Sequence, residues 1–172
     1  MSVLTRKKIF DEIKKNNIII QPFNKNQVGT GSIDLSLSDR LRIFNKTTKA
    51  SKITEEADYK KITKKVRISK SKPFILRPNE TILAGTKEKI TLSANLCGWI
   101  EGRSRFARFG LGVHVSAGFI HPGTSNNPVL EVTNLGPISL VLIPGVKICQ
   151  VIIERCEGEE TYQGKFKDQN QA

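Results

Sequence analysis

The residues best suited to chemistry are concentrated in the stretch EGRSRFARFG at positions 101–110. Its three arginines, Arg103, Arg105 and Arg108, suit a phosphate chain, because a guanidinium group binds phosphate oxygens in a bidentate manner. A short helix here would place Ser104 and Arg108 on one face, since residues i and i+4 are neighbours on a helix. The same composition is equally typical of a charged surface turn, so both interpretations stay open.

Two phenylalanines of this stretch predict how it is anchored. Phe106 and Phe109 stand at i and i+3, so on a short helix they would pack into the core from the opposite face. Gly102 allows the backbone to approach a ligand closely, and the first free amides of a helical turn attract anions. We therefore expect a strand, a short helix and a second strand, in this order.

An isolated carboxylate stands in the apolar stretch VLEVTN, residues 129–134. Alternation in a strand would place Leu130 and Val132 on one face and Glu131 on the other. A carboxylate in such a strand is commonly its solvent-facing residue. The alternative is a general acid and base whose pKa is adjusted by partial burial.

Histidine and cysteine spacing does not favour a metal site. His114 and His121 are seven residues apart, and no two of the three cysteines lie within four residues of each other. Structural zinc sites and zinc-dependent deaminases use closely spaced ligands such as Cys-x-x-Cys. The sequence therefore predicts chemistry without zinc. An odd, sparse set of cysteines predicts a reducing, cytoplasmic location rather than a disulfide framework.

Short apolar strands are expected to position these residues. One helix is predicted first, capped by Thr5 and with Ile9, Phe10 and Ile13 at helical spacing. After it, runs rich in Ile, Val, Leu and Thr recur between Gly, Pro and Asn, which is typical of an all-β sandwich or barrel. The predicted strands are residues 32–37, 41–44, 73–76, 81–84, 97–100, 111–115, 129–133, 138–143 and 147–154.

Length and hydropathy define the class of protein. The chain of 172 residues fits a single domain, residues 1–172, and its 38% hydrophobic content is enough for a core. No apolar run approaches the roughly 18 residues of a membrane helix. The N-terminus becomes polar at Thr5 with no apolar segment behind it, so no secretory signal is expected. The polar segment 157–172 is expected to be a flexible tail.

Positive charge is concentrated in one segment. The formal net charge is +12, and residues 46–72 hold ten Lys and Arg against three acidic residues. This Lys-rich segment has few large apolar residues and is expected to be a solvated insertion loop. An arm that binds a polyanion is the alternative. Tyr59 is its only aromatic residue, which disfavours single-stranded nucleic acid as a partner.

Taken in order along the chain, several motifs resemble those of the dCTP deaminase family. The resemblance extends from the N-terminal helix to the tail, and the Lys-rich segment is its main unmatched part. Several ordered motifs in one chain are far more specific than any one of them. The motifs are GSIDLSL (31–37), RIF (42–44), GRSxxARxGL (102–111), HVxA (114–117), IxPG (120–123), VLExxN (129–134), PGxKIxQ (144–150) and YxGKFxxQ (162–169).

The resemblance implies a mainly β fold, a distorted jelly roll of the trimeric dUTPase-like superfamily with a short N-terminal helix. It implies a homotrimer whose active sites lie between subunits. The implied reaction is the zinc-independent hydrolytic deamination of dCTP to dUTP and ammonia, which supplies dUTP for dUMP and dTTP synthesis. Mg²⁺ would accompany the triphosphate. The expected partner is therefore dCTP, and neither a membrane nor nucleic acid is expected.

The matching motifs also imply roles for individual residues. Glu131 would shuttle protons, and Arg108 would orient it and stabilise developing charge. Ser104 and the carbonyl group of Ala117 would hold the attacking water. The tail would close over the nucleotide as a lid. The implied substrate-binding residues are Arg103, Ser104, Arg105, Phe106, Ala107, Arg108, His121, Val129, Leu130, Glu131, Tyr162, Lys165 and Gln169.

Three positions depart from the family pattern. His121 stands where the family usually has an aspartate that contacts the deoxyribose and, in dUTPases, helps to activate water, so little dUTP hydrolysis is predicted. Arg105 replaces a small hydroxyl residue, and residues 124–128 form a polar turn that ends in proline. The alternatives are a dUTPase or bifunctional enzyme on the same fold, a nucleic-acid-binding β protein, and a nucleotide-binding protein without turnover.

Overall fold

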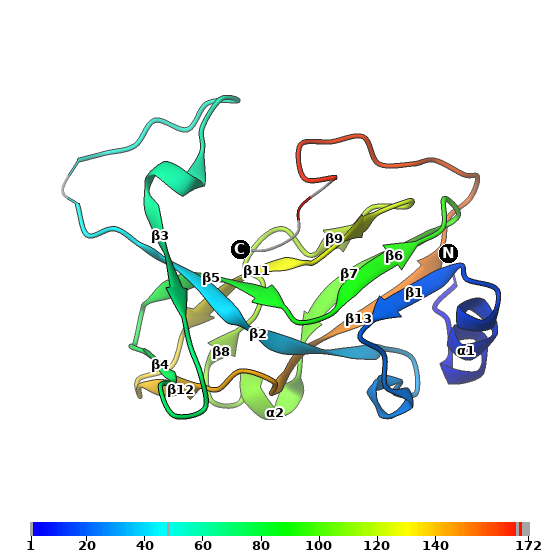
Figure 1. Ribbon diagram of the computed structural model, residues 1–172, viewed down its shortest axis with the longest axis horizontal. Coiled ribbons are helices and arrows are strands. Elements are labelled where there is room, and N and C mark those ends of the chain that lie inside the picture. Colours follow the sequence, from blue (N-terminus) through cyan, green and yellow to red (C-terminus); the bar gives the residue numbers. More distant parts are fainter. Residues whose placement is uncertain (1, 48, 168, 170–172) are drawn as a thin grey trace.

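The computed structural model describes residues 2–47, 49–167 and 169, and it confirms the predicted mainly β class (Figure 1). Every strand pairing is antiparallel. No helix in the described part of the chain is long and apolar enough to cross a membrane. The helical elements are α1 (Arg6–Lys14), η1 (Lys25–Gln27), η2 (Tyr59–Lys61) and α2 (Ser104–Ala107).

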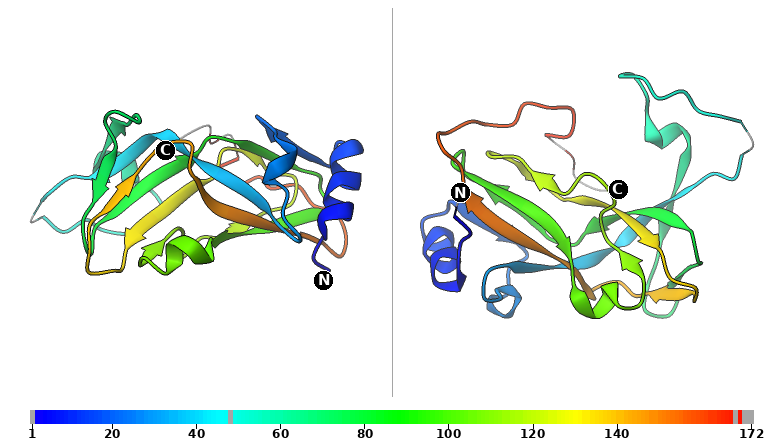
Figure 2. Two further views of the ribbon diagram at one scale, coloured as in Figure 1. Left: turned by 90° about the horizontal axis from the view of Figure 1, so that it is seen from below. Right: turned by 180° about the vertical axis from the view of Figure 1, so that it is seen from behind.

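An eight-stranded sheet forms most of the molecule. It consists of β2 (Ile33–Phe44), β3 (Thr63–Arg67), β5 (Thr81–Thr86), β7 (Leu96–Gly102), β8 (Leu111–Gly112), β9 (Phe119–Ile120), β11 (Val129–Asn134) and β13 (Lys147–Arg155). The strand order is β8-β11-β5-β2-β13-β7-β9, and β3 pairs with β2 beside this path. The register of β2 against β5 shifts between Leu37 and Leu41. Such irregularities increase twist, and the sheet curls around the core (Figure 2).

Two smaller sheets complete the fold. The first contains β1 (Ile18–Gln21), β6 (Lys89–Leu92) and β10 (Ser125–Asn126) in the order β1-β6-β10. The second pairs β4 (Phe74–Leu76) with β12 (Leu140–Leu142). The sequence predictions missed β1, β3, β6, β9 and β10. Two of these, β9 and β10, contain only two residues each, so they are too short to show alternation.

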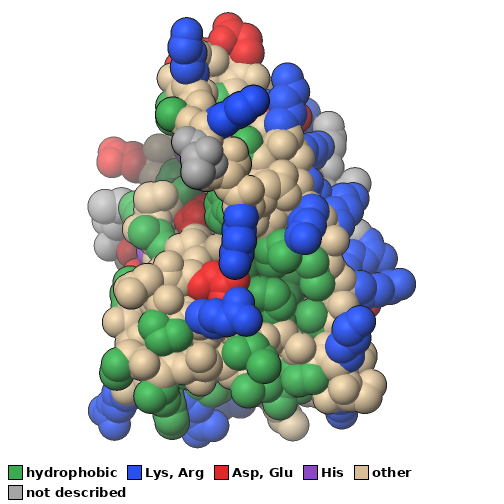
Figure 3. All heavy atoms as spheres, turned by 90° about the vertical axis from the view of Figure 1, so that its left-hand side faces the viewer, with side chains coloured by type: hydrophobic (Ala, Val, Ile, Leu, Met, Phe, Trp, Pro, Cys, Tyr) green, Lys and Arg blue, Asp and Glu red, His purple; other side chains and the backbone are tan. Residues whose placement is uncertain are grey.

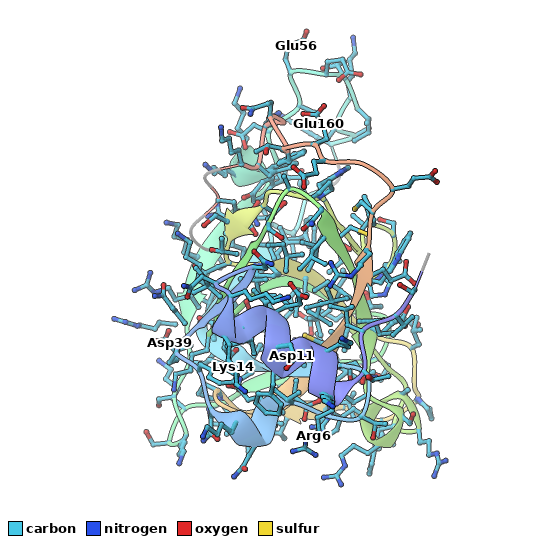
Figure 4. The ribbon with its side chains drawn as sticks, turned by 90° about the vertical axis from the view of Figure 1, so that its right-hand side faces the viewer. Arg6, Asp11, Lys14, Asp39, Glu56 and Glu160 are labelled. Atoms are coloured by element: carbon cyan, nitrogen blue, oxygen red, sulfur yellow. The ribbon has the colours of Figure 1, made fainter. Side chains whose placement is uncertain are left out.

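The helix α1 begins where the sequence predicts it, directly after Thr5, although the Thr5 side chain makes no capping hydrogen bond. Its inner face buries Ile9 against the strands, and Arg6 and Lys14 lie exposed on its outer face (Figure 4). Glu12 is also buried on this helix. The element therefore uses a charged residue as well as apolar ones to pack on the sheet.

The Lys-rich segment is not a loop throughout. Its central part forms η2 and then β3, which pairs with β2 from Arg67–Arg40 to Thr63–Phe44. Thr63 and Ile68 are both 5% exposed. The prediction of a loop is therefore wrong for η2 and β3, because long-range pairing with β2 leaves no mark on a Lys-rich composition. Lys60, Lys61, Lys64 and Lys65 are exposed, as expected of a solvated segment. The described residues before η2 extend away from the sheet (Figure 1).

Candidate active site

A cavity of about 420 Å³ lies where β9 and β11 meet the Lys-rich segment and the C-terminal tail. Apolar and aromatic walls with a few polar groups are typical of a small-molecule site. The cavity brings together seven predicted site residues, Ala117, His121, Val129, Leu130, Glu131, Tyr162 and Gln169. The remaining lining residues are Phe44, Tyr59, Leu83, Ile100, His114, Phe119, Ile120, Thr124, Asn126, Pro128 and Phe166.

Strand pairing sets the orientation of Glu131. Its neighbours Leu130 and Val132 are 1% and 0% exposed in the core, so alternation turns Glu131 to the other face, as predicted. Glu131 lies opposite Leu83 of β5 in the register. The Val115 N–H donates a hydrogen bond to the Glu131 carboxylate over 3.3 Å. The carboxylate is half-buried in the cavity wall, where it can exchange protons with a ligand.

The segment between β8 and β9 adds Ala117 and a residue that the sequence did not predict, His114. His114 Nδ1 is buried and has no hydrogen-bond partner among the described residues. The ring is held by packing against Gly118, where a Cβ would lie only 2.8 Å from His114 Cε1. The HVxA motif includes His114, but it does not show that the ring reaches the cavity, because that contact depends on how the segment folds back.

Four aromatic rings form a continuous row beside the cavity. The centroids of Trp99 and Phe119 are 4.8 Å apart, and Phe119 meets His121 edge-on at 4.8 Å. His121 then stacks on Tyr162 at 4.7 Å with an angle of 11° between the planes. Contacts of this kind between aromatic rings stabilise the folded chain in addition to the free energy gained by burying their apolar area. His121 thus connects β9 to the C-terminal tail.

The described part of the tail lines the cavity with Tyr162, Phe166 and Gln169. The Tyr162 N–H donates to the Pro122 carbonyl oxygen at 3.0 Å, and Asn126 Nδ2 donates to the Phe166 carbonyl oxygen at 3.1 Å. Positions 168 and 170–172 of the tail lie outside the described residues. The tail therefore occupies the position expected of a lid, and ordering of the tail on nucleotide binding stays a prediction.

The predicted residues around α2 do not line this cavity of their own chain. Arg103 lies 3.3 Å from the Asp34 carboxylate and donates to the Lys147 carbonyl oxygen at 2.9 Å. Ser104 and Arg108 are exposed. One chain therefore does not bring Ser104 and Arg108 to Glu131. The same holds for Arg105, Phe106 and Ala107.

The residues around α2 border an apolar hollow instead. This second cavity, of about 420 Å³, is lined by Phe106, Phe109 and most of residues 138–143. Phe109 is 58% exposed, so its predicted packing into the core is wrong, because α2 spans only four residues and ends before it. Val141 of β12 is 57% exposed. Apolar side chains gather on the side of the molecule that carries β3, among Lys and Arg (Figure 3).

Comparison with known proteins identifies the family. A family model described as dCTP deaminase-like matches residues 3–156. The chain belongs to the dCTP deaminase-like family. The match covers α1 and every strand, and it ends before Tyr162, Lys165 and Gln169. The predicted family resemblance is therefore confirmed.

Curated relatives support this membership. The "dCTP deaminase, dUMP-forming" of Methanosphaera stadtmanae is 34% identical over 156 residues, which are 90% of this chain and 79% of that protein. The "dCTP deaminase" of Buchnera aphidicola is 41% identical over 150 residues, 83% of this chain and 78% of that protein. The first name states dUMP as the product, and the second name states no product.

A solved structure supports the fold. The 2′-deoxycytidine 5′-triphosphate deaminase from Agrobacterium tumefaciens matches 90% of this dCTP deaminase-like chain with a TM-score of 0.70 and 15% identity. This chain spans 48% of that chain. The match shows that this chain shares the mainly β fold of that deaminase.

Lys165 is the one predicted tail residue that does not line the cavity, and its role in binding stays a prediction. Its Nζ donates to the Ala57 carbonyl oxygen of the Lys-rich segment at 3.2 Å. No three His, Cys, Asp or Glu side chains gather to form a metal site within residues 2–47, 49–167 and 169. The polar side chains that line the cavity are Glu131, the two histidines and a few hydroxyl and amide groups.

Proposed function

We propose that this chain deaminates dCTP by hydrolysis, giving dUTP and ammonia. Glu131 is the observation that carries the proposal, because it is the one carboxylate among the described residues that line the cavity. The cavity volume of about 420 Å³ suits a nucleotide-sized ligand. Membership of the dCTP deaminase-like family supports cytosine as the base.

Two proton transfers accompany the exchange of the amino group for oxygen, one from water to N3 and one from the new hydroxyl to the amino group. Water loses a proton as its oxygen bonds to C4, and N3 of the ring gains one. N3 keeps this proton in the uracil product. The new hydroxyl then loses its proton, the amino group gains one, and the C4–N bond breaks as ammonia leaves. Glu131 would take the proton from water and pass protons on, which contributes roughly 10²–10⁴-fold as general acid and base. Ala117 lines the same cavity, where its carbonyl would help to hold the water.

A second copy of the chain would supply Ser104 and Arg108. Both are exposed beside an apolar hollow and are absent from the cavity of their own chain. A symmetric assembly buries the same patch of each subunit. We therefore propose a homotrimer with sites between subunits, in which α2 of one copy faces Glu131 of the next.

Mg²⁺ would be bound with the triphosphate. The described residues offer no cluster of three metal ligands, which fits an ion held by phosphate oxygens and water. When bound, the ion offsets phosphate charge. Arg103 and Arg105 would bind the remaining phosphate oxygens through their guanidinium groups. Tyr162 and Gln169 would close the tail over the nucleotide.

The identity of the product depends on whether a second water is activated. His121 stacks on Tyr162, and no second carboxylate is present among the described lining residues. This arrangement favours dUTP as the final product. Direct formation of dUMP is the second candidate, and it is supported by the name of the Methanosphaera stadtmanae relative.

A reducing compartment, the cytoplasm, suits the cysteines. Cys97, Cys149 and Cys156 are all free. Burial is the main cause that raises the pKa of the Cys97 thiol to about 11, and burial also raises the pKa of Cys149. Both thiols stay protonated at neutral pH and are poor nucleophiles.

A product assay tests the proposal. Purified protein is incubated with dCTP and Mg²⁺, and dUTP, dUMP, pyrophosphate and ammonia are resolved. We expect dUTP and ammonia in equal amounts, without pyrophosphate. Formation of dUMP and pyrophosphate would support the second candidate, and unchanged dCTP would overturn both.

The matched variants are Glu131→Gln and Glu157→Gln, the second at an exposed tail carboxylate. Glu131→Gln should lower kcat by at least about 10²-fold, because the amide cannot accept the proton from water. The affinity for dCTP should stay nearly unchanged, because glutamine has the same shape as glutamate. Glu157→Gln should resemble the wild type. Retention of kcat in Glu131→Gln would exclude Glu131 as the proton shuttle.

A further inference from the structure

The Lys-rich segment reaches the substrate cavity through one residue, Tyr59. The Tyr59 ring lines the cavity together with Phe44, the last residue of β2. The tail residue Phe166 lines it as well. The segment that carries most of the excess charge of the chain thus also supplies an aromatic wall to the candidate active site.

Tyr59 is held in place by a buried arginine. Arg42 of β2 is 5% exposed, and its guanidinium carbon lies 5.6 Å from the centre of the Tyr59 ring. Arg42 Nε donates to Thr63 Oγ1 at 2.8 Å, and Nη2 donates to the Lys60 and Thr63 carbonyl oxygens at 3.4 and 3.3 Å. A buried charge is costly unless it is hydrogen-bonded. The three oxygen acceptors and the Tyr59 ring therefore offset the cost of burying the Arg42 charge.

Register places Arg42 on the cavity side of the sheet. Arg42 lies opposite Leu83 of β5, and Leu83 lies opposite Glu131 of β11. Residues directly opposite each other on neighbouring strands point to the same face. Leu83, Glu131 and the Tyr59 that Arg42 supports all line the cavity.

Local contacts shape the turn that carries Tyr59. Asp58 Oδ1 accepts a hydrogen bond from the Lys60 N–H at 2.9 Å and so caps η2. Thr63 Oγ1 donates to the Tyr59 carbonyl oxygen at 2.8 Å. The Tyr59 backbone is therefore fixed from both sides of the turn, and its ring has a defined position against the cavity.

The tail meets the same segment. Lys165 Nζ donates to the Ala57 carbonyl oxygen at 3.2 Å. Glu56, one residue before Ala57, and Glu160 of the tail lie toward the same end of the molecule (Figure 4). The Lys-rich segment and the tail thus enclose the cavity together.

We propose that Tyr59 contacts the bound nucleotide and sets its affinity, and that Arg42 is the positioning residue that holds Tyr59. The inference rests on the proposed function, because it takes the cavity to be the nucleotide site. It assigns the Lys-rich segment to the substrate site of a pyrimidine deoxynucleoside triphosphate.

The test compares Tyr59→Ala with Tyr59→Phe. Tyr59→Ala removes the ring and should raise the KM and the Kd for dCTP with Mg²⁺ by about 10-fold, with little change in kcat. Tyr59→Phe keeps the ring and should stay within about 2-fold of the wild type. Lys52→Ala and Lys64→Ala, at exposed positions of the same segment, are the matched controls and should leave kcat and KM unchanged.

Arg42→Lys tests the positioning role. It keeps the charge and loses the planar guanidinium, so KM should rise as in Tyr59→Ala, and the two changes combined should be less than additive. If Arg42→Lys is unstable to urea, the comparison of Tyr59→Ala with Tyr59→Phe decides alone. An unchanged KM and Kd in Tyr59→Ala would overturn the inference.

Measuring binding as well as turnover separates the inference from the proposed function. Normal turnover with no effect of Tyr59→Ala would contradict the inference alone. Binding of dCTP that Tyr59→Ala weakens, without any turnover by the wild type, would contradict the proposed function alone. Absence of dCTP binding by the wild type would overturn both.

Discussion

His121 occupies the rim of the cavity as a stacked ring. It packs flat on Tyr162 and meets the edge of Phe119, so its ring connects the tail to β9. The position departs from the family pattern quoted above, where a carboxylate is usual. In this chain the residue therefore contributes a surface on which the tail rests.

Replacement of His121 by alanine should weaken closure of the tail. The stacked contact is lost, and ring pairs contribute about 0.5–1.5 kcal/mol beyond buried area, so KM for dCTP should rise by about 3-fold to 10-fold. His121→Phe keeps a ring at the position and should retain most of the affinity. Steady-state kinetics of both variants checks this. Equal KM values for the alanine and phenylalanine variants would show that stacking does not hold the tail.

Among the elements, α1 is attached to the sheet by a buried carboxylate. Glu12 is 2% exposed and accepts hydrogen bonds from Asn17 at 2.6 Å and from Arg155 of β13 at 2.5 Å. The Asn17 hydrogen bond is the main cause that lowers the pKa of Glu12 below its ordinary value of 4.5, and Arg155 lowers it further. Ionised Glu12 thus joins the first helix to the last strand.

This lowered pKa predicts a dependence of stability on pH. A carboxylate with a depressed pKa in the folded state stabilises the protein above its unfolded pKa, and the contribution is lost as the pH falls through the folded pKa. Glu12→Gln should lower the free energy of unfolding by about 1–3 kcal/mol at neutral pH. The difference from the wild type should shrink as the pH falls below 4.5.

Urea unfolding of both proteins between neutral and acidic pH provides the measurement. Asp11→Asn on the same helix is the control, since within the described part of the chain the Asp11 carboxylate pairs only with the exposed Lys8, at 4.0 Å. If the difference in the free energy of unfolding between Glu12→Gln and the wild type does not change with pH, the site requires the shape of Glu12 and not its charge.

For the whole molecule, the main consequence is the separation of the predicted catalytic groups. Glu131 faces one cavity, whereas Ser104 and Arg108 lie exposed near another. A single chain therefore holds two incomplete halves of the proposed site. Assembly of copies around an axis can join each half to its complement.

Mixing two inactive variants tests this arrangement. Glu131→Gln and Arg108→Ala should each be inactive, and co-refolded mixtures should regain up to about a quarter of wild-type activity, because some sites then combine two intact halves. The double variant refolded alone should regain none. Light scattering should give about three times the chain mass of 19.2 kDa. Absence of recovery in mixed trimers would place each site within one chain.

Local patterns in the sequence were sufficient to predict the orientation of Glu131, two helices and the family. Alternation around Glu131 predicted which of its neighbours enter the core, because the face of a strand residue follows from its position alone. The helix after Thr5 and the short helix at Ser104 were predicted for the same kind of reason. The ordered motifs identified the family, and with it the fold.

Only the tertiary structure decided how the site is enclosed. Tyr59 reaches the cavity through pairing of β3 with β2, and His114 through the fold of its segment against Gly118. The exposure of Phe109 and the separation of α2 from Glu131 likewise depend on elements that are distant in sequence. Contacts of this kind have no local periodicity, so the amino-acid order does not show them until the chain is folded.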